Sequence, residues 1–305
     1  MTAAQFIHPA LALLLAPLLP GIINRTKAFF AGRNGPPLLQ AYYDLWKLLR
    51  KGAVYSRTTT WLFRAGPMVG LAAVITTLAL VPFGGQSAPL AFPGDMVLAV
   101  YLLGLMRLFT VLAALDTGSA FEGMGASREV KFSALAEPGL LLGLAALAVE
   151  TGRWSLSEIF VGIQPEDWAG SGPALALVTA GIFIVFLTEN ARIPVDDPNT
   201  HLELTMIHEV MVLDHSGPDF AYILYGASLK LWVLGAILIG IVMPIPSGNA
   251  WADMVGALSA MFALAVLVGI VESCMARLRL LRVPQLLVSA TVLCGLALVL
   301  LLRKT

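Results

Sequence analysis

The sequence predicts an all-α membrane protein with eight transmembrane helices and one further amphipathic helix in the first connection. Hydrophobic residues make up 58% of the 305 residues and charged residues only 12%, and the mean hydropathy is +0.84. Soluble proteins contain roughly 45–50% apolar and about 25% charged residues. This chain therefore lacks the charge that would cover a water-exposed surface. The apolar runs are also far longer than the alternating segments of about 10 residues that form membrane β-barrels.

Eight apolar runs have the length of about 20 residues that a transmembrane helix requires. Lipid offers no hydrogen-bond partners to the backbone, so each run must be helical. The first run lacks the basic region and small-residue cleavage site of a signal peptide, and we expect it to remain as a span. Residues 1–305 then form a single polytopic membrane domain. The expected spans lie near residues 3–24, 66–86, 96–115, 131–149, 170–188, 222–244, 254–273 and 284–302.

Basic residues are distributed unequally between the two sides that eight spans define. The first, third, fifth and seventh connections hold 14 bases, against three on the opposite side. Because loops rich in Lys and Arg stay in the cytoplasm, we expect both termini to lie outside the cell's inner membrane. The 14 bases are Arg25, Lys27, Arg33, Lys47, Arg50, Lys51, Arg57, Arg64, Arg128, Lys131, Arg192, Arg277, Arg279 and Arg282; the three are Arg153, Arg303 and Lys304.

The first connection, residues 25–64, contains an amphipathic segment with the sequence LLQAYYDLWKLLRK at 38–51. At helical spacing its apolar side chains fall on one stripe. Such a helix lies in the plane of the membrane surface, either as a lipid-facing anchor or as the wall of a site that opens near the headgroups. The stripe comprises Leu38, Tyr42, Leu45 and Leu49, and the other side carries Asp44, Lys47 and Lys51.

Ionisable residues occur inside the expected spans, where each costs at least about 2.5–3.5 kcal/mol on insertion scales. Such residues face the interior of the bundle, where they pair with one another or line a wet path. A set of buried carboxylates close to cations is the minimum chemistry of a proton relay; the alternative for each is a purely structural ion pair. The acids are Glu137, Glu189 and Glu272, and the charge partners are Arg107 and Lys230.

The fifth connection, residues 189–221, is the densest polar segment of the chain. Seven acids share it with a single base, Arg192, and Pro194 and Pro198 end the preceding helix. Because anionic headgroups repel such a loop, we expect it to be folded into the protein or covered by a partner, with Arg192 paired to Asp196 or Asp197. The seven acids are Glu189, Asp196, Asp197, Glu203, Glu209, Asp214 and Asp219.

Several other sites are not predicted. His201, His208 and His215 recur every seven residues, about two helical turns apart and too far to share one metal ion, so interface or proton-handling roles are favoured. The two cysteines lack CxxC spacing and predict neither a zinc site nor an iron–sulfur ligand set. Zero net charge gives no electrostatic case for nucleic-acid binding. The Gly- and Ser-rich third connection, 116–132, predicts a tightly packed turn.

Five segments together resemble subunit 1 of respiratory complex I, in the branch that includes the membrane subunits of formate hydrogenlyase and hydrogenase-4. The resemblance covers nearly the whole chain, with the motifs in order. GASRE at 125–129 matches the hydrogenase form better than the quinone-reducing form. The segments are GRNGPPLLQAYYDLWKLL at 32–49, ALDTGSAFEGMGASRE at 114–129, ALAEPGLLLGL at 134–144, TENARIPVDDPNTHLEL at 188–204 and ESCMARLRLLRVPQ at 272–285.

The resemblance implies an eight-helix subunit that docks a soluble redox arm and begins a line of acidic residues into the membrane. No catalytic residue, resident cofactor or metal is expected on this chain, and a bound quinone is kept only as an alternative. A [NiFe] centre and iron–sulfur clusters are expected in its partners: hydrogenase-like large and small subunits, an iron–sulfur protein and antiporter-like membrane subunits. The relay candidates are Glu137, Glu189, Glu203, Glu209 and Glu272, and the docking candidates are Arg192, Asp196, Asp197, Arg128 and Glu129.

The sequence therefore predicts a membrane subunit of an energy-converting [NiFe]-hydrogenase or formate hydrogenlyase-like complex. It would couple electron transfer in the partners to movement of protons or Na⁺ along buried carboxylates. One alternative is a quinone-chamber subunit of an NADH-quinone oxidoreductase-type complex. Another is a secondary transporter, which usually shows internal repeats that this chain does not convincingly contain. A passive anchor does not explain the charges inside the spans.

Overall fold

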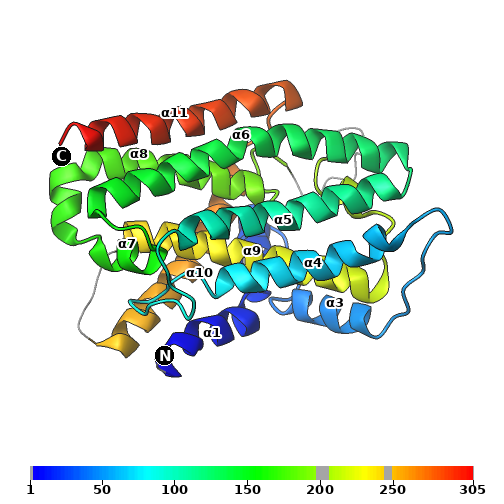
Figure 1. Ribbon diagram of the computed structural model, residues 1–305. Coiled ribbons are helices and arrows are strands. Elements are labelled where there is room, and N and C mark those ends of the chain that lie inside the picture. The colour runs from blue at the N-terminus through cyan, green and yellow to red at the C-terminus, as the bar shows by residue number, and fades with distance from the viewer. Residues whose placement is uncertain (1–2, 197–205, 244–248, 305) are drawn as a thin grey trace.

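The computed structural model describes residues 3–196, 206–243 and 249–304, and most of these lie in helices. Within these ranges there is no β-strand, only an isolated bridge between Phe83 and Gln86. The all-α prediction is confirmed. The long helices run side by side along one direction, and the labelled N and C ends lie toward the same end of the bundle (Figure 1). Residues 190–196 and 206–216 lie toward the opposite end, which we call the loop end.

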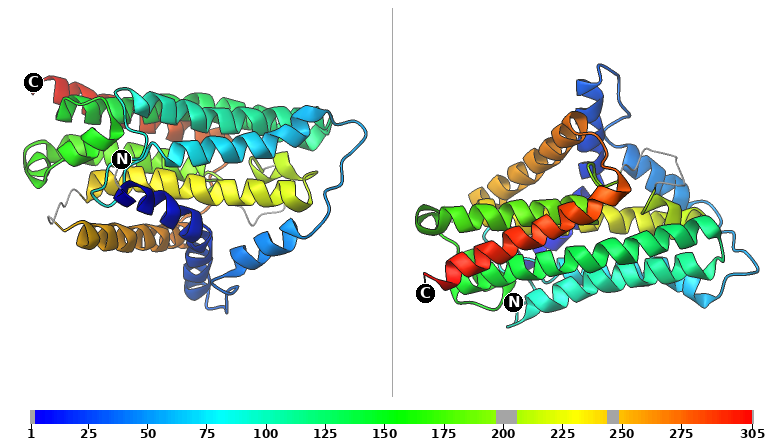
Figure 2. Two further views of the ribbon diagram at one scale, coloured as in Figure 1. Left: turned by 60° about the horizontal axis from the view of Figure 1, so that its bottom comes forward. Right: turned by 90° about the horizontal axis from the view of Figure 1, so that it is seen from above.

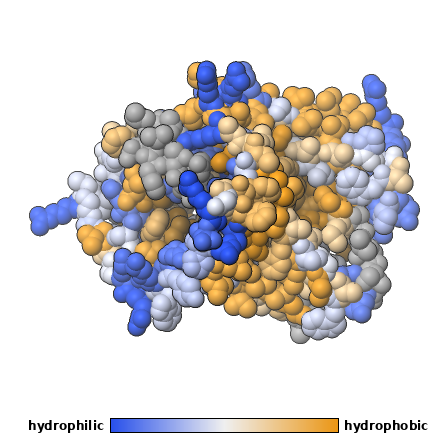
Figure 3. Space-filling model, turned by 180° about the vertical axis from the view of Figure 1, so that it is seen from behind, coloured by the Kyte–Doolittle hydropathy of each residue, from blue (hydrophilic) through white to orange (hydrophobic). Residues whose placement is uncertain are grey.

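Seven helices of the described residues are long and apolar enough to cross a membrane. At about 1.5 Å per residue, even the shortest reaches roughly the thickness of the hydrocarbon core. Hydrophobic side chains cover much of one face of the molecule, and hydrophilic ones project at both ends (Figure 3). The helices are α4 (Trp61–Leu78), α5 (Asp95–Asp116), α6 (Ala120–Thr151), α8 (Pro165–Glu189), α9 (Gly217–Val242), α10 (Ala250–Cys274) and Leu280–Leu302, which joins η3 (Leu280–Arg282) to α11 (Val283–Leu302).

The first expected span is not one straight helix. After η1 (Ala3–Phe6), the chain forms α1 (Ile7–Leu15) and α2 (Leu18–Phe30), which meet at an angle of 47°. Pro17 lies at the break, where its missing N–H and its ring prevent the helix from continuing. The pair is apolar enough to count as one span, which gives seven or eight spans in total. Figure 2 shows α2 projecting from the body of the bundle.

Two further boundaries differ from the sequence prediction. The second span ends at Leu78 rather than near residue 86, because Pro82 and two glycines with positive φ, Gly84 and Gly85, turn the chain back. The expected turn at 116–132 is mostly helix, since α6 begins at Ala120. Its Gly125 serves close packing: an added Cβ would collide with the Val210 side chain.

Outside the spans, α3 (Gln40–Leu49) forms within the predicted amphipathic segment, and none of its residues is buried. A short helix, α7 (Leu156–Gly162), precedes α8, and η2 (Glu209–Val212) lies in the loop before α9. The loop begins where α8 ends at Glu189 and Ala191 adopts a left-handed conformation with φ 52°. The chain therefore leaves the helix before Pro194 is reached.

Helix α9 forms the centre of the bundle. Of its most apolar window 72% is buried, whereas the other spans have 28–50%. Trp232 in its middle is fully buried, and its indole Nε1 donates a hydrogen bond to His8 Nε2 of α1 at 3.1 Å. Around it, α4 packs on α5 and α9, α11 packs on α6 and α8, and α10 packs on α2. A charged residue on α9 is therefore directed among other helices and not into lipid.

Candidate functional site

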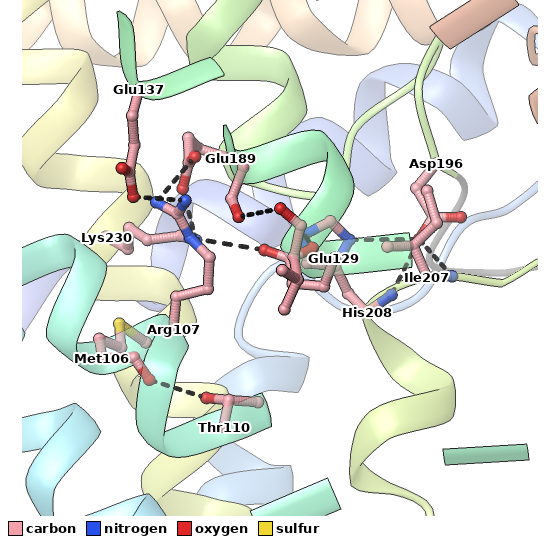
Figure 4. A network of polar contacts seen from close by, with 12 residues as sticks. Met106, Arg107, Thr110, Glu129, Glu137, Glu189, Asp196, Ile207, His208 and Lys230 are labelled. Atoms are coloured by element: carbon pink, nitrogen blue, oxygen red, sulfur yellow. Dashed lines mark hydrogen bonds and ion pairs between the residues drawn. The ribbon is translucent and has the colours of Figure 1, made fainter. Parts of the chain in front are cut away.

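Arg107 of α5 joins three carboxylates from two other helices (Figure 4). Its Nη1 lies 3.0 Å from Glu137 Oε1, its Nη2 lies 3.0 Å from Glu189 Oε1, and its Nε lies 3.5 Å from Glu129 Oε1. The planar guanidinium presents its donors in a fixed fork, and here each nitrogen serves a different acid. Nε lies near Glu129 without a hydrogen bond to it, and a lysine at this position could supply the charge but not the separate contacts of the two Nη atoms.

The positions of these acids follow from the helices that carry them. Glu129 and Glu137 are eight residues apart on α6, or about 12 Å along the helix axis, so the Arg107 side chain lies between them. Glu189 is the last residue of α8. A negative charge there is disfavoured by the partial negative charge of the helix C-terminus. Arg107 and Lys230, whose Nζ lies 3.3 Å from Glu189 Oε2, offset that cost.

The contacts continue from Glu129 into the loop. His208 Nε2 lies 3.2 Å from Glu129 Oε2, and His208 Nδ1 lies 3.3 Å from Asp196 Oδ2. Arg277 Nη2 then lies 2.8 Å from Asp196 Oδ1. We call this continuous set the Arg107 network; it consists of Arg107, Glu129, Glu137, Glu189, Asp196, His208, Lys230 and Arg277.

Charge within the Arg107 network balances when His208 is protonated, because four carboxylates then face four cations. Burial opposes the charged form of His208, but the carboxylates of Glu129 and Asp196 outweigh it and raise the pKa of the ring above its usual 6.5. Burial also opposes the charge of Asp196, yet His208 and Arg277 lower the pKa of that carboxyl. Both shifts stabilise the charged pair at neutral pH.

Glu137 differs from the other acids of the Arg107 network in its exposure. Its side chain is 41% exposed, whereas those of Glu129 and Glu189 are each 6% exposed. It lies near the middle of α6, a helix long and apolar enough to cross a membrane. A carboxylate facing hydrocarbon is costly. The network therefore reaches the outer surface of this chain at membrane depth.

A second ion cluster joins α2 and α10 to the start of the loop. The fully buried carboxylate of Glu272 lies 2.8 Å from Lys27 Nζ and 3.5 Å from Arg192 Nη1. The expected partner of Arg192 was Asp196 or Asp197. Asp196 instead pairs with Arg277 and His208, and Asp197 lies outside the described residues. The chain turns after α8, with Asp196 N–H donating to Arg192 O at 3.2 Å. The Arg192 side chain reaches Glu272 of α10, whereas that of Asp196 reaches His208 and Arg277, which lie outside the helices.

The remaining candidates divide into three groups. Arg128 Nη1 donates a hydrogen bond to Met206 O at 2.7 Å and so joins α6 to the loop. Glu209 begins η2. Glu203, Asp197 and His201 lie outside the described residues. His208 and His215 have different surroundings: His208 belongs to the Arg107 network, whereas His215 stacks on Phe63 with ring centroids 3.9 Å apart.

Sequence reasoning missed Lys27, His208 and Arg277 as site residues. Lys27 and Arg277 are ordinary cytoplasmic bases in a count of loop charges, and they reach buried acids only through the packing of α2 and α10. The main chain brings Arg277 into place, because Leu278 N–H donates to Pro194 O at 2.9 Å. The seven-residue histidine spacing pointed to an interface or proton-handling role for His208, but it did not predict which acids His208 would contact.

Comparison with known proteins identifies the family. Residues 3–303 match the family described as NADH dehydrogenase. This chain belongs to the NADH dehydrogenase family, that of complex I subunit 1. Within the family it is 32% identical over 278 residues to formate hydrogenlyase subunit 4 of Escherichia coli (strain K12), covering 89% of each chain.

Other relatives of this chain are named as components of hydrogenase-4 and of NADH-quinone oxidoreductase, and a solved structure shares its fold. The chain is 33% identical to hydrogenase-4 component C of the same bacterium, over 76% of this chain and 72% of the relative. It is 28% identical to a subunit of the NADH-quinone oxidoreductase of Wolbachia pipientis wMel, covering 68% of this chain and 65% of that one. A chain of the membrane-bound sulfane sulfur reductase, an archaeal respiratory membrane complex, shares the fold with a TM-score of 0.84 at 21% identity, covering 98% of both chains.

Proposed function

We propose that this chain is the membrane-arm subunit of an energy-converting [NiFe]-hydrogenase or formate hydrogenlyase-like complex. It anchors the soluble redox arm at the loop end and couples electron transfer there to movement of protons or Na⁺ through the membrane. The observation that carries the proposal is the Arg107 network. Its contacts run without a break from Asp196 in the loop to Glu137, which is exposed at membrane depth.

Long helices with a connected set of charges are suited to transmit a change at the redox arm. Movement of the loop would alter the contacts of Asp196 and His208. That change reaches Glu129 and then Arg107, whose guanidinium is shared by three acids. Weakening one of these pairs alters the affinity of the others for a proton, because interacting sites titrate together. Coupling in this scheme needs no redox group on this chain.

The exposed carboxylate of Glu137 supports a neighbouring membrane subunit as the next member of the pathway. The relatives formate hydrogenlyase subunit 4 and hydrogenase-4 component C are named as components of larger assemblies. We expect hydrogenase-like large and small subunits and an iron–sulfur protein at the loop end, and antiporter-like subunits beside α5 and α6. The base asymmetry and an eight-span count favour a cytoplasmic loop end, an inner-membrane location and both termini outside.

The experiment that tests the assignment is purification of the intact complex in mild detergent, followed by mass spectrometry of its subunits. A large subunit with two CxxC nickel-ligand pairs is expected. A large subunit lacking both pairs would reject the hydrogenase assignment. Reconstitution into liposomes then tests coupling: Glu189→Gln should abolish the proton gradient formed during turnover, and an unchanged gradient would reject the relay.

A further inference from the structure

A third buried polar cluster lies at the loop end, separate from the Arg107 network and from the ion cluster around Glu272. Glu122 comes from the first turn of α6, His215 from the loop, and Asp219 from the first turn of α9. They are 0%, 7% and 7% exposed, respectively. The cluster lies where α4, α6 and α9 begin, since His215 also stacks on Phe63 of α4.

Asp214 links Glu122 to the segment that carries His215. The backbone N–H of Asp214 donates to Glu122 Oε1 at 3.1 Å, and His215 is the next residue. Burial lowers the pKa of the His215 ring, and the carboxylates of Asp219 and Asp214 oppose this by favouring its charged form. At the outer side, burial and the adjacent Asp219 carboxylate raise the pKa of Tyr55, whose ring also lies under Arg64 at 4.3 Å.

Each member carries one buried polar atom without a hydrogen-bond partner in the part of the chain that the structure describes. These atoms are Glu122 Oε2, His215 Nδ1 and Asp219 Oδ2. A buried polar group left unsatisfied costs about 1–3 kcal/mol, and native proteins satisfy such groups with protein or ordered water. Each of these atoms is therefore available to a buried water, which needs 2–4 polar partners.

The cluster has an aqueous side and a membrane side. Asp214 is exposed and Tyr55 is half-buried, so both reach water at the loop end. Glu129 of the Arg107 network lies seven residues beyond Glu122 on α6, about 10.5 Å along the axis and on nearly the same face. Between the two acids, the Val210 side chain packs on Gly125. Transfer along this face therefore requires η2 to move, which places a barrier between the two clusters.

We propose that Glu122, His215 and Asp219 form a hydrated proton-uptake site that accepts protons from water at the loop end and delivers them toward Glu129. The proposal rests on the function proposed above and adds the entry point. The step moves one proton from bulk water onto the cluster and from there inward, with no electron transfer. Burial lowers the pKa of His215 to about 4, so its ring is neutral near pH 7 and passes a proton onward without holding it.

Chemical rescue tests the site in the intact complex reconstituted into liposomes. Glu122→Gln and His215→Ala should each slow proton uptake by about a hundredfold, the lower end of the contribution of a positioned proton-transfer group. Added imidazole should restore uptake in His215→Ala but not in Glu122→Gln. The control is Glu158→Gln, whose side chain is 57% exposed at the opposite end of the bundle; it should behave as wild type.

Two outcomes would overturn the proposal. Wild-type uptake in Glu122→Gln and His215→Ala, with Glu189→Gln still impaired, removes the entry site and leaves the proposed function standing. Wild-type coupling in all three variants rejects both. A structural measurement is independent of turnover: high-resolution electron microscopy of the complex should show ordered water within hydrogen-bond distance of Glu122 Oε2 and His215 Nδ1. A dry, closely packed cluster would also reject the proposal.

Discussion

The guanidinium of Arg107 lies 3.0 Å from the carboxylate of Glu137, although the arginine is 9% exposed and the glutamate 41% exposed. One ion pair therefore connects the interior of the bundle to its outer surface at membrane depth. Arg107 also holds Glu129 and Glu189. A change of charge at Glu137 therefore alters the electrostatic environment of two buried carboxylates, because all three acids share the Arg107 side chain.

Replacing Glu137 with Gln tests whether this surface carboxylate takes part in coupling. The amide preserves the shape and can still accept from Arg107, but it cannot titrate. We expect normal assembly and a reduced proton gradient per turnover in liposomes. Glu158→Gln provides a matched control, because it removes an exposed acid outside the network. Coupled turnover at the wild-type rate in Glu137→Gln would remove this residue from the relay.

Removing Arg107 should destabilise the protein. Arg107→Ala leaves two buried carboxylates without their shared cation, and truncating one member of a buried pair costs about 3–5 kcal/mol. Thermal unfolding of the detergent-solubilised complex should show a lower midpoint for Arg107→Ala than for wild type. The midpoint of Arg107→Lys should lie between the two. Adding Glu189→Gln to Arg107→Ala should recover part of the loss, because one of the unpaired charges is removed. Additive losses would show that the two residues are not coupled.

Arg192 should help to retain the redox arm, because its pair with buried Glu272 joins the start of the loop to α10. Arg192→Ala is expected to weaken the hold on the iron–sulfur partner while the spans still insert. Counting the soluble subunits per membrane subunit after detergent purification measures this. Glu272→Gln should show the same direction of effect. A full complement of subunits and wild-type activity in Arg192→Ala would contradict docking through this segment.

His208 should make stability depend on pH. Its pKa is raised in the folded protein, so its contribution is fully present below the unfolded value of about 6.5 and is lost as pH rises through the folded pKa. The lowered pKa of Asp196 gives a contribution to stability that is lost only in acid, so this contribution does not change with pH at neutral and alkaline values. Unfolding midpoints measured between pH 6 and pH 9 should fall with pH in wild type and less steeply in His208→Gln. Equal slopes would exclude His208 as the source.

The orientation can be tested by labelling two exposed positions in connections that are expected on opposite sides of the membrane. A cysteine replacing Trp154, which is 65% exposed, should react with an impermeant thiol reagent from outside the cell. A cysteine replacing Asn34, also exposed, should react only after the membrane is opened. The control is the protein that carries only its native cysteines. The reagent should leave this control unlabelled when it is added from outside the cell. The reverse pattern would place the loop end outside and overturn the base-asymmetry argument.

The sequence by itself determined the class of the protein, because hydrophobic length and charge depletion are properties that lipid selects residue by residue. It also identified Arg107, Glu137, Glu189, Lys230 and Glu272 as unusual, since the cost of an ionisable group in a span does not depend on its partner. Helix boundaries were less predictable where glycine serves packing, as at Gly125, or where proline bends a span, as at Pro17.

Only the tertiary structure decided which charges meet. Glu272 pairs with Lys27 and Arg192, and Asp196 pairs with Arg277, over sequence separations of about 80 residues or more. Glu137 was expected in the interior, yet its carboxylate is substantially exposed. The physical reason is that hydrophobicity is a property of each residue and its neighbours in the sequence, so it can be assessed without knowing the fold. An ion pair instead depends on how helices rotate and cross, and those angles follow from the packing of the whole bundle.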